Sequence, residues 1–170
     1  MILLLSGIDV FVPSFDGTSY LEFLGLRRSV LTFTEIEIVF KPEAATGLIL
    51  YNGYRSDRTG DFIALALRDG FFEFQYDLGT GPALLNSSAP LALHEWHTVK
   101  VTRTGRDGTL KVDDQRPVRG MSKGSYTQLT LTLDLFIGGH RNFDEVVTTA
   151  DVSEPFKGCV QKVNNVVKCV

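Results

Sequence analysis

The segment at residues 62–76 reads FIALALRDGFFEFQY and contains two apolar runs that flank an Asp-Gly pair. An Asp-Gly pair between apolar runs is a strong signal for a tight hairpin turn, so the segment predicts two paired β-strands. In the second run Phe72, Phe74 and Tyr76 share one face, while Glu73 and Gln75 share the other. The segment therefore predicts an antiparallel sheet with one apolar face turned towards a core.

Strand-like patterns continue on both sides of this hairpin. Residues 30–40 alternate apolar and polar, although Leu31, Phe33, Ile36 and Ile38 can share one face only if a bulge or break interrupts the strand. We find no stretch of about twelve residues with helical spacing and caps. Many short strands separated by turn signals predict an all-β sandwich or barrel in a single domain, residues 1–170. The further strands are expected at residues 48–51, 96–103, 109–113, 129–133 and 135–137, and near Val160 and Val163.

Composition and charge narrow the class of protein. Apolar residues make up 44% and charged residues 22% of the chain, which excludes a disordered or collagen-like protein. The net charge of -3 argues against a nucleic-acid partner, because phosphate binding needs a basic surface. No segment approaches the ~20 apolar residues of a membrane span, so no direct membrane insertion is expected. Residues 1–9 are expected to form an edge strand or to lie outside the domain proper, whose core spans roughly residues 10–168.

Two features bear on the cellular compartment. Cys159 and Cys169 are either two free thiols or one disulfide, and a disulfide indicates an oxidising, extracellular environment. Asn86-Ser87-Ser88 is an N-glycosylation acceptor in a polar stretch where a surface turn is expected. Neither cysteine lies in a Cys-x-x-Cys motif or beside a histidine cluster, so a zinc site is not expected.

An enzyme is the competing hypothesis. Curved β-sandwiches include retaining glucanases, which need two carboxylates about 5–5.5 Å apart. Glu35 and Glu37 could form such a pair on one strand face, but the solvent-facing side of an alternating strand explains them better. His94 is expected in a loop and His97 in a strand, and no serine or cysteine lies in a nucleophile-elbow context. We therefore expect a binding module and no catalysis.

A series of segments runs through the chain in a distinctive order and spacing, among them Phe15-Asp16-Gly17, Gly47-Leu48-Ile49-Leu50-Tyr51, Gly60-Asp61-Phe62-Ile63 and Tyr76-Asp77-Leu78-Gly79. Together with the segments given below, they resemble the laminin G-like (LNS) domain, in particular those of agrin, perlecan, pikachurin and eyes-shut proteins. The resemblance covers roughly residues 10–168. It implies a jelly-roll-like sandwich of two curved antiparallel sheets, related to concanavalin A, in agreement with the strand pattern. The further segments are Trp96-His97-Thr98-Val99, Leu135-Phe136-Ile137-Gly138-Gly139 and Phe156-Lys157-Gly158-Cys159.

The resemblance implies one calcium ion at the rim of the sandwich. Carried over to this sequence, the family pattern places a carboxylate ligand at Asp61 and carbonyl ligands at Leu78 and Thr130. The second side-chain ligand is usually Asp or Asn, but this sequence has Thr132 there, with Asp134 as a possible substitute. A neutral hydroxyl supplies no charge, so the departure predicts weaker calcium binding.

Members of the family bind acidic glycans of α-dystroglycan, heparan sulfate or receptor ectodomains. By resemblance, this domain is expected to be an extracellular module that recognises an acidic glycan through calcium and basic loops, beside EGF-like or laminin G-like neighbours. The alternative is a calcium-independent module for protein recognition or structure. Candidate contacts are Arg55, Arg58, Thr80 and Arg141, and a separate heparin-binding set would be Lys100, Arg103, Arg106 and Lys111.

The cysteines also depart from the family pattern. In the family, the cysteine of Phe-x-Gly-Cys commonly bonds a partner farther along the chain, whereas Cys169 follows Cys159 by only ten positions. A terminal hairpin that turns at residues 163–165 would bring Cys159 opposite Cys169. The resemblance together with this hairpin predicts a disulfide between them.

Overall fold

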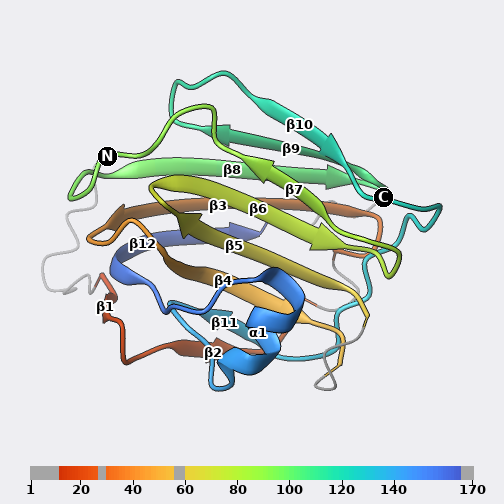
Figure 1. Cartoon of the computed structure of the whole chain (residues 1–170), viewed down its shortest axis with the longest axis horizontal. Coiled ribbons are helices and arrows are strands. Elements are labelled where there is room, and N and C mark those ends of the chain that lie inside the picture. The colour runs from red at the N-terminus through yellow and green to blue at the C-terminus, as the bar shows by residue number, and fades with distance from the viewer. Residues whose placement is uncertain (1–11, 27–29, 56–59, 166–170) are drawn as a thin grey trace, which may run out of the picture.

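The computed structural model describes residues 12–26, 30–55 and 60–165 of the chain. The described strands are β1 (Ser14–Asp16), β2 (Leu21–Phe23), β3 (Phe33–Pro42), β4 (Gly47–Gly53), β5 (Phe62–Arg68), β6 (Phe71–Asp77), β7 (Ala83–Asn86), β8 (His97–Thr104), β9 (Asp107–Val112), β10 (Val118–Met121), β11 (Leu135–Ile137) and β12 (Lys157–Asn165). They form sheet A, in the order β1-β12-β3-β8-β9-β10, and sheet B, in the order β2-β11-β4-β5-β6-β7 (Figure 1). The predicted sandwich of two antiparallel sheets is confirmed.

The hairpin of β5 and β6 forms as its sequence predicts. Asp69 and Gly70 have φ values of 51° and 85°, as the mirror-image turns of two-residue hairpins require. Phe72, Phe74 and Tyr76 are fully buried between the sheets, in the main hydrophobic core. The turn chemistry therefore fixes the register that directs three aromatic rings inward.

β3 needs no bulge to reach the core. Its pairing with β8 is continuous from Phe33 to Phe40, and every second residue from Thr34 onward is buried. The inner face thus begins with Thr34, which leaves Phe33 on the outer face. A polar residue is tolerated at this inner position because the Thr34 hydroxyl accepts hydrogen bonds from the buried Arg103.

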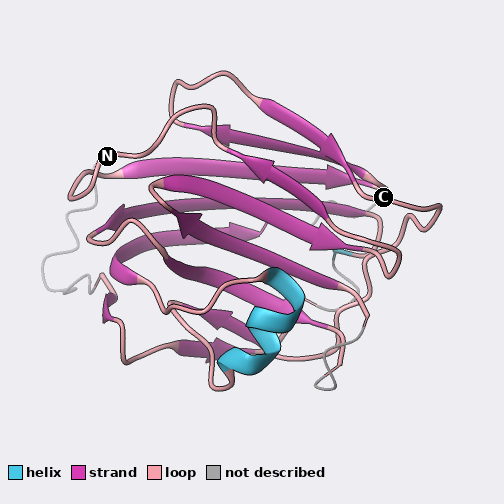
Figure 2. Ribbon diagram, viewed as in Figure 1, coloured by secondary structure: helices cyan, strands magenta, loops and turns pink. Residues whose placement is uncertain are grey.

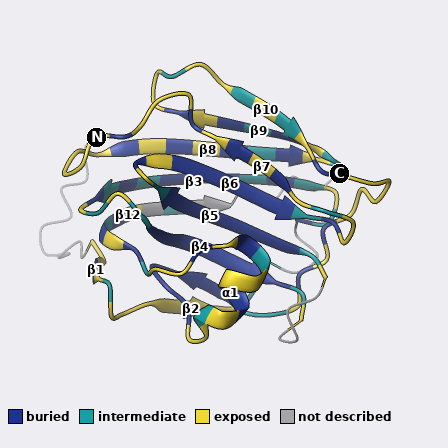
Figure 3. Ribbon diagram, in the orientation of Figure 1, coloured by how far each residue is buried: buried dark blue, intermediate teal, exposed yellow. Residues whose placement is uncertain are grey.

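A short helix, α1 (Phe143–Ala150), covers the outer face of sheet B (Figure 2). Asn142 caps its N-terminus, because the Asn142 side chain accepts the Asp144 N–H at 3.2 Å. Val146 and Ala150 pack into a second apolar cluster with Leu48, Tyr51, Phe62, Ala64, Ala66 and Val152. Since β4 has an apolar core on both sides, all of its residues are buried (Figure 3). The sequence analysis did not predict α1, because this helix has only eight residues and the expected helical pattern needs about twelve.

The predicted strand at residues 129–133 is wrong. This segment crosses from β10 of sheet A to β11 of sheet B, and its backbone bonds go to two separate places instead of to one neighbouring strand. The Leu129 N–H donates to Leu31 O, whereas the N–H groups of Thr132 and Leu133 both donate to Gly53 O. Leu129 and Leu131 are nevertheless buried, which explains the strand-like alternation in the sequence.

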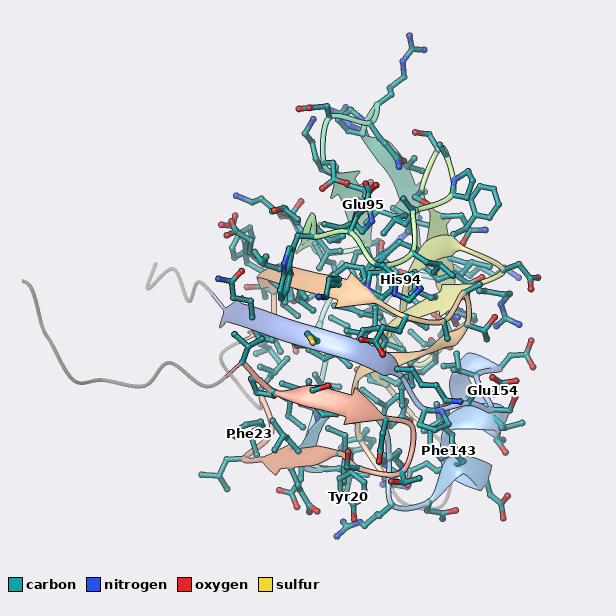
Figure 4. All side chains as sticks on the ribbon, turned by 90° about the vertical axis from the view of Figure 1, so that its left-hand side faces the viewer. Tyr20, Phe23, His94, Glu95, Phe143 and Glu154 are labelled. Carbon is teal, nitrogen blue, oxygen red and sulfur yellow. The ribbon has the colours of Figure 1, made fainter. Side chains whose placement is uncertain are left out.

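β12 lies between β1 and β3, at one side of the sandwich. Residues 163–165 belong to this strand, so the predicted terminal hairpin is wrong. Cys159 is opposite Lys41 on β3, and Cys169 lies outside the described residues, so the disulfide stays a prediction. Residues 1–9 also lie outside the described part. Figure 4 views the same side of the molecule, where Tyr20 and Phe23 are partly exposed.

Candidate functional site

The loops at one rim of the sandwich meet because neighbouring strands of sheet B are antiparallel. β4 ends, β5 begins and β6 ends at this rim, since Gly53 pairs with Phe62 and Phe62 pairs with Asp77. Residues that immediately follow or precede these strand ends are therefore brought together. The crossing segment that contains Thr130 passes the same rim and is hydrogen-bonded to Gly53.

Asp61 is half-buried at the centre of this rim. Its Oδ2 accepts the backbone N–H of Thr130 at 2.7 Å, and Oδ1 receives no hydrogen bond from the described residues. Burial raises the pKa of Asp61 above its usual value, the Thr130 N–H lowers it in part, and the charge of Asp77 raises it again. The carboxylate is thus held in a place that disfavours its negative charge, which a bound cation would relieve.

Asp77 organises the neighbouring loop. Its Oδ1 accepts the backbone N–H groups of Gly79, Thr80 and Gly81 at 2.7, 3.1 and 3.0 Å. Gly79 has φ +95°, and a Cβ there would lie 3.2 Å from Asp61 Oδ1. The loop approaches Asp61 this closely because position 79 has no side chain.

Arg103 lies beneath the rim and is completely buried. It donates to the carbonyls of Val30, Leu31, Gly105 and Thr127 and to the Thr34 hydroxyl. Burial lowers the pKa of Arg103 to about 10, while the charges of Tyr76 and Asp61 oppose this. Arg103 thereby ties the loop at Thr127 to sheet A. Its inclusion in a heparin-binding surface was wrong, because its side chain points into the sandwich.

These loops line a cavity of about 420 Å³ that is open to solvent. Asp61, Leu78 and Thr130 line it, together with Gly79, Tyr54 and the loop at residues 125–128. Sequence reasoning missed Tyr54 and Tyr126. An available signal was the polar stretch at residues 122–128 with one tyrosine, since a large aromatic residue in a polar loop is typical of a binding surface. We call this space the rim cavity.

The structure brings together three of the expected metal ligands. Asp61, Leu78 and Thr130 line the rim cavity, but Thr132 does not, because its hydroxyl donates to Tyr54 O. Asp134 is also absent from the described cavity lining. Within residues 12–26, 30–55 and 60–165, no group of three or more His, Cys, Asp and Glu side chains is placed to hold a metal. The residues therefore fit a weak oxygen-ligand site with a single charged ligand.

The expected glycan contacts are distributed unevenly. Arg55 is exposed, and its guanidinium lies 5.0 Å from the ring centroid of Tyr54, which itself lines the rim cavity. The Thr80 hydroxyl donates to Lys123 O at 2.8 Å, beside Gly79. Arg141 is elsewhere, since it pairs with Glu22 of β2 at 3.2 Å and covers Phe136. Arg58 lies outside the described residues.

The remaining candidates have ordinary structural partners. Glu35 pairs with Lys100 at 3.0 Å on the outer face of sheet A, which gives both side chains a structural partner. Both ring nitrogens of His97 are occupied, one by Asp113 at 2.7 Å and the other by Ala92 O at 2.8 Å. Asn86 is exposed at the end of β7, so its glycosylation stays a prediction. The described part of the chain has no helix with the length and apolar character of a membrane span.

Comparisons with known proteins agree with this architecture. The family model described as "Laminin G domain" matches residues 40–166. Human pikachurin is 41% identical over 133 residues, covering 78% of this chain and 13% of pikachurin. The mouse basement membrane-specific heparan sulfate proteoglycan core protein is 37% identical over 160 residues, covering 93% of this chain and 4% of that protein. Domains LG4-5 of the mouse laminin alpha1 chain superimpose with a TM-score of 0.79 at 23% identity, over 95% of this chain and 43% of that one.

Proposed function

This chain belongs to the laminin G domain family, and we propose that it is an extracellular binding module that recognises an acidic glycan in the rim cavity. The chain spans only 13% or less of the curated relatives named above. One of those relatives is a basement membrane proteoglycan by name, which supports the same extracellular compartment for this chain. We further propose that EGF-like or laminin G-like domains flank this domain in a longer chain, and that the domain binds its ligand without catalysis.

The observation that carries this proposal is the placement of Asp61 in the rim cavity. Asp61 lines a space of about 420 Å³, and one of its carboxylate oxygens accepts the Thr130 N–H while the other receives no hydrogen bond from the described residues. Tyr54 and Tyr126 add aromatic surface beside it, and backbone carbonyls and hydroxyls surround it. Sugars are recognised by such combinations of flat aromatic faces and polar groups.

Calcium is part of the proposal as a weakly held ion. Asp61 would supply the charged ligand, and the carbonyls of Leu78 and Thr130 would supply neutral oxygen ligands. Bound calcium supplies positive charge that an acidic sugar can share. With one carboxylate and a Thr132 hydroxyl directed at Tyr54, we expect a dissociation constant of about 1 mM, as in weak extracellular calcium modules.

Arg55 is the basic residue that we propose for the sugar carboxylate. It is exposed, and its guanidinium lies over Tyr54, which lines the rim cavity. Arg141 is engaged by Glu22 on β2 and does not line the cavity, so it is not part of this site. The glycan of α-dystroglycan and heparan sulfate are the two ligand types to compare.

Calorimetric calcium titration and surface plasmon resonance test this function. We expect millimolar calcium binding by the wild type, and binding of immobilised α-dystroglycan glycan or heparan sulfate that chelator removes. Asp61→Ala should lose both, whereas Asp114→Ala, at an exposed turn, should lose neither. Glycan binding that survives both chelator and Asp61→Ala would reject this mechanism.

A calcium-independent protein-recognition module is the second candidate. The observation that favours it is the Thr132 hydroxyl, which is committed to Tyr54 O and leaves the site one charge short of the family pattern. In that case a receptor ectodomain should bind equally well in calcium and in chelator. The same resonance measurement with receptor ectodomains on the chip distinguishes the two functions.

A further inference from the structure

β7 forms one edge of sheet B and exposes an apolar side chain there. It pairs with β6 on one side, and within the described part of the chain no strand pairs with its other side (Figure 1). The Ser87 N–H donates to Phe72 O on β6 at 2.8 Å. Because alternate residues of an antiparallel strand bond to the same neighbour, the backbone groups of Leu84 and Asn86 point to the open side. Leu84 is 56% exposed, so a second copy of the chain can extend the sheet at this place.

The other three edge strands of the two described sheets carry charge. β1 contains Asp16, β2 contains Glu22 and β10 contains Arg119, and all three residues are exposed. Charged residues and proline on an edge strand discourage pairing with another chain. β7 reads Ala83-Leu84-Leu85-Asn86 and has neither. It is thus the edge strand that needs protection from another group.

Asn86 is placed to hold such a group. Side chains two positions apart on a strand point the same way and lie about 6.5–7 Å apart, so Asn86 and Leu84 share the outer face of β7. The residues that alternate with them, Ala83, Leu85 and Ser87, are buried. The Asn86 side chain is exposed and has no hydrogen bond to a described residue. A large group attached to it would project over Leu84 without breaking a contact of the fold.

The sequence around Asn86 supplies the attachment chemistry. Asn86-Ser87-Ser88 is the only N-glycosylation acceptor in the 170 residues. The donor is a lipid-linked oligosaccharide of the secretory pathway, through which extracellular proteins pass. The side-chain nitrogen of Asn86 forms a bond to C1 of the first sugar as the bond from C1 to the lipid diphosphate breaks. The diphosphate leaves with the electron pair, the amide nitrogen loses one proton, and nothing is oxidised or reduced.

We propose that Asn86 carries an N-linked glycan that covers Leu84 and the open side of β7, and so prevents two copies of the domain from pairing through sheet B. An N-linked glycan is bulky and keeps the surface around it in water, which suits it to this role. The inference rests on the extracellular location of the family and not on the rim cavity.

The test uses the chain secreted from cultured animal cells that attach high-mannose glycans. The intact mass of the wild type should exceed that of Asn86→Gln by one glycan. In sedimentation velocity at rising protein concentration, the wild type should stay monomeric, whereas Asn86→Gln should shift to larger species. An endoglycosidase that leaves a single sugar on Asn86 should cause the same shift in the folded wild-type protein, which excludes misfolding of the variant as the cause.

A second substitution tests whether the shift arises at β7. Leu84→Lys in the Asn86→Gln background should restore the monomer, because lysine protects an edge strand. Leu93→Lys in the same background is the matched control. Leu93 is 40% exposed in the loop before β8, so the same change in charge there should leave the larger species unaltered.

Two kinds of result overturn the proposal. A wild-type protein without a glycan, or an Asn86→Gln variant as monomeric as the wild type, leaves the glycan without this role. Restoration by neither lysine variant, or equally by both, places the association outside the open side of β7. The calcium and saccharide measurements on Asp61→Ala do not depend on these outcomes, so the proposed function is judged separately.

Discussion

The rim cavity and the helix-covered face of sheet B are built from the same strands but by opposite chemistry. Under α1, the outer sides of β4 and β5 are apolar and enclosed, and β4 is buried at every residue. At the rim, the loops that leave these strands carry Asp61 and Asp77, whose charges repel each other. The covered face contributes stability, whereas the rim gives up stability for a site that can receive a ligand.

Arg103 supports the loops of the rim from below, and its removal should have the largest effect. Arg103→Met leaves buried carbonyls such as those of Val30 and Gly105 without donors, and should lower the free energy of unfolding by about 3–5 kcal/mol. Chemical denaturation in urea measures this loss. Arg103→Lys keeps the charge and should retain part of the stability, and a loss below about 1 kcal/mol for the methionine variant would show that the rim does not depend on Arg103.

The covered face is tested by two adjacent valines of α1. Val146 is fully buried against sheet B, whereas Val147 is 41% exposed. Val146→Ala should lower the free energy of unfolding by about 2 kcal/mol, because it removes buried methyl groups and leaves a cavity. Val147→Ala should cost less than about 0.5 kcal/mol. If thermal denaturation shows an equally small loss of stability for Val146→Ala and Val147→Ala, α1 does not pack against the sheet.

The N-terminal cap of α1 should matter less. Asn142→Ala removes the acceptor for the Asp144 N–H and should cost about 1 kcal/mol. Asn142→Asp keeps an acceptor and adds a charge that the helix N-terminus favours, so it should be close to neutral. Urea denaturation of the wild type and the two variants measures their free energies of unfolding. A larger loss for Asn142→Asp than for Asn142→Ala would contradict the assigned cap.

The rim should show the smallest change, and with the opposite sign. Because the pKa of Asp61 is raised by folding, the folded state holds this proton more tightly than the unfolded state does. Wild-type stability from this group therefore falls as the pH rises from about 3.8 through the folded pKa. Asp61→Asn retains an acceptor for Thr130 without the charge, so in chelator at pH 7 it should gain up to about 0.5 kcal/mol.

The control for Asp61→Asn is the pH dependence itself. Below the unfolded pKa of the carboxyl group, both proteins are neutral at position 61 and should unfold at similar temperatures. At pH 7, where Asp61 can supply its charge, added calcium should raise the melting temperature of the wild type only. An asparagine variant that is less stable than the wild type at pH 7 in chelator would show that the Asp61 charge stabilises the rim.

Local patterns in the sequence predicted the two sheets of the fold but not the helix α1 that covers sheet B. The Asp69-Gly70 turn and the alternation in β8 identified paired strands because turn chemistry and side-chain period act over a few residues. The continuous apolar runs of β4 and β5 are typical of strands that are buried on both faces, whereas we predicted only one apolar face for this sheet. The prediction of no helix also gave no weight to the Asn142 cap and the acidic first turn of α1. An eight-residue helix gives a weak periodic signal, so its cap was the better evidence.

The candidate site was predictable only in part, for a similar physical reason. The family resemblance located Asp61, Leu78 and Thr130, and they do line one cavity. Arg103 was misassigned to a surface because a basic residue at a strand end is usually exposed, whereas here carbonyls converge on its guanidinium. Tyr54 and Tyr126 belong to loops whose approach to the rim depends on long-range packing, which single-sequence patterns do not encode.

The position of β12 has a consequence for biosynthesis. Residues 157–165 are synthesised after every other described strand, yet they occupy an internal place in sheet A between β1 and β3. Until they emerge from the ribosome, β3 presents an unpaired edge with alternating apolar side chains, which other chains can extend by strand pairing. The nascent domain therefore depends on rapid completion or chaperone cover in the secretory pathway, and a stop codon before residue 157 should yield aggregate instead of a smaller folded domain.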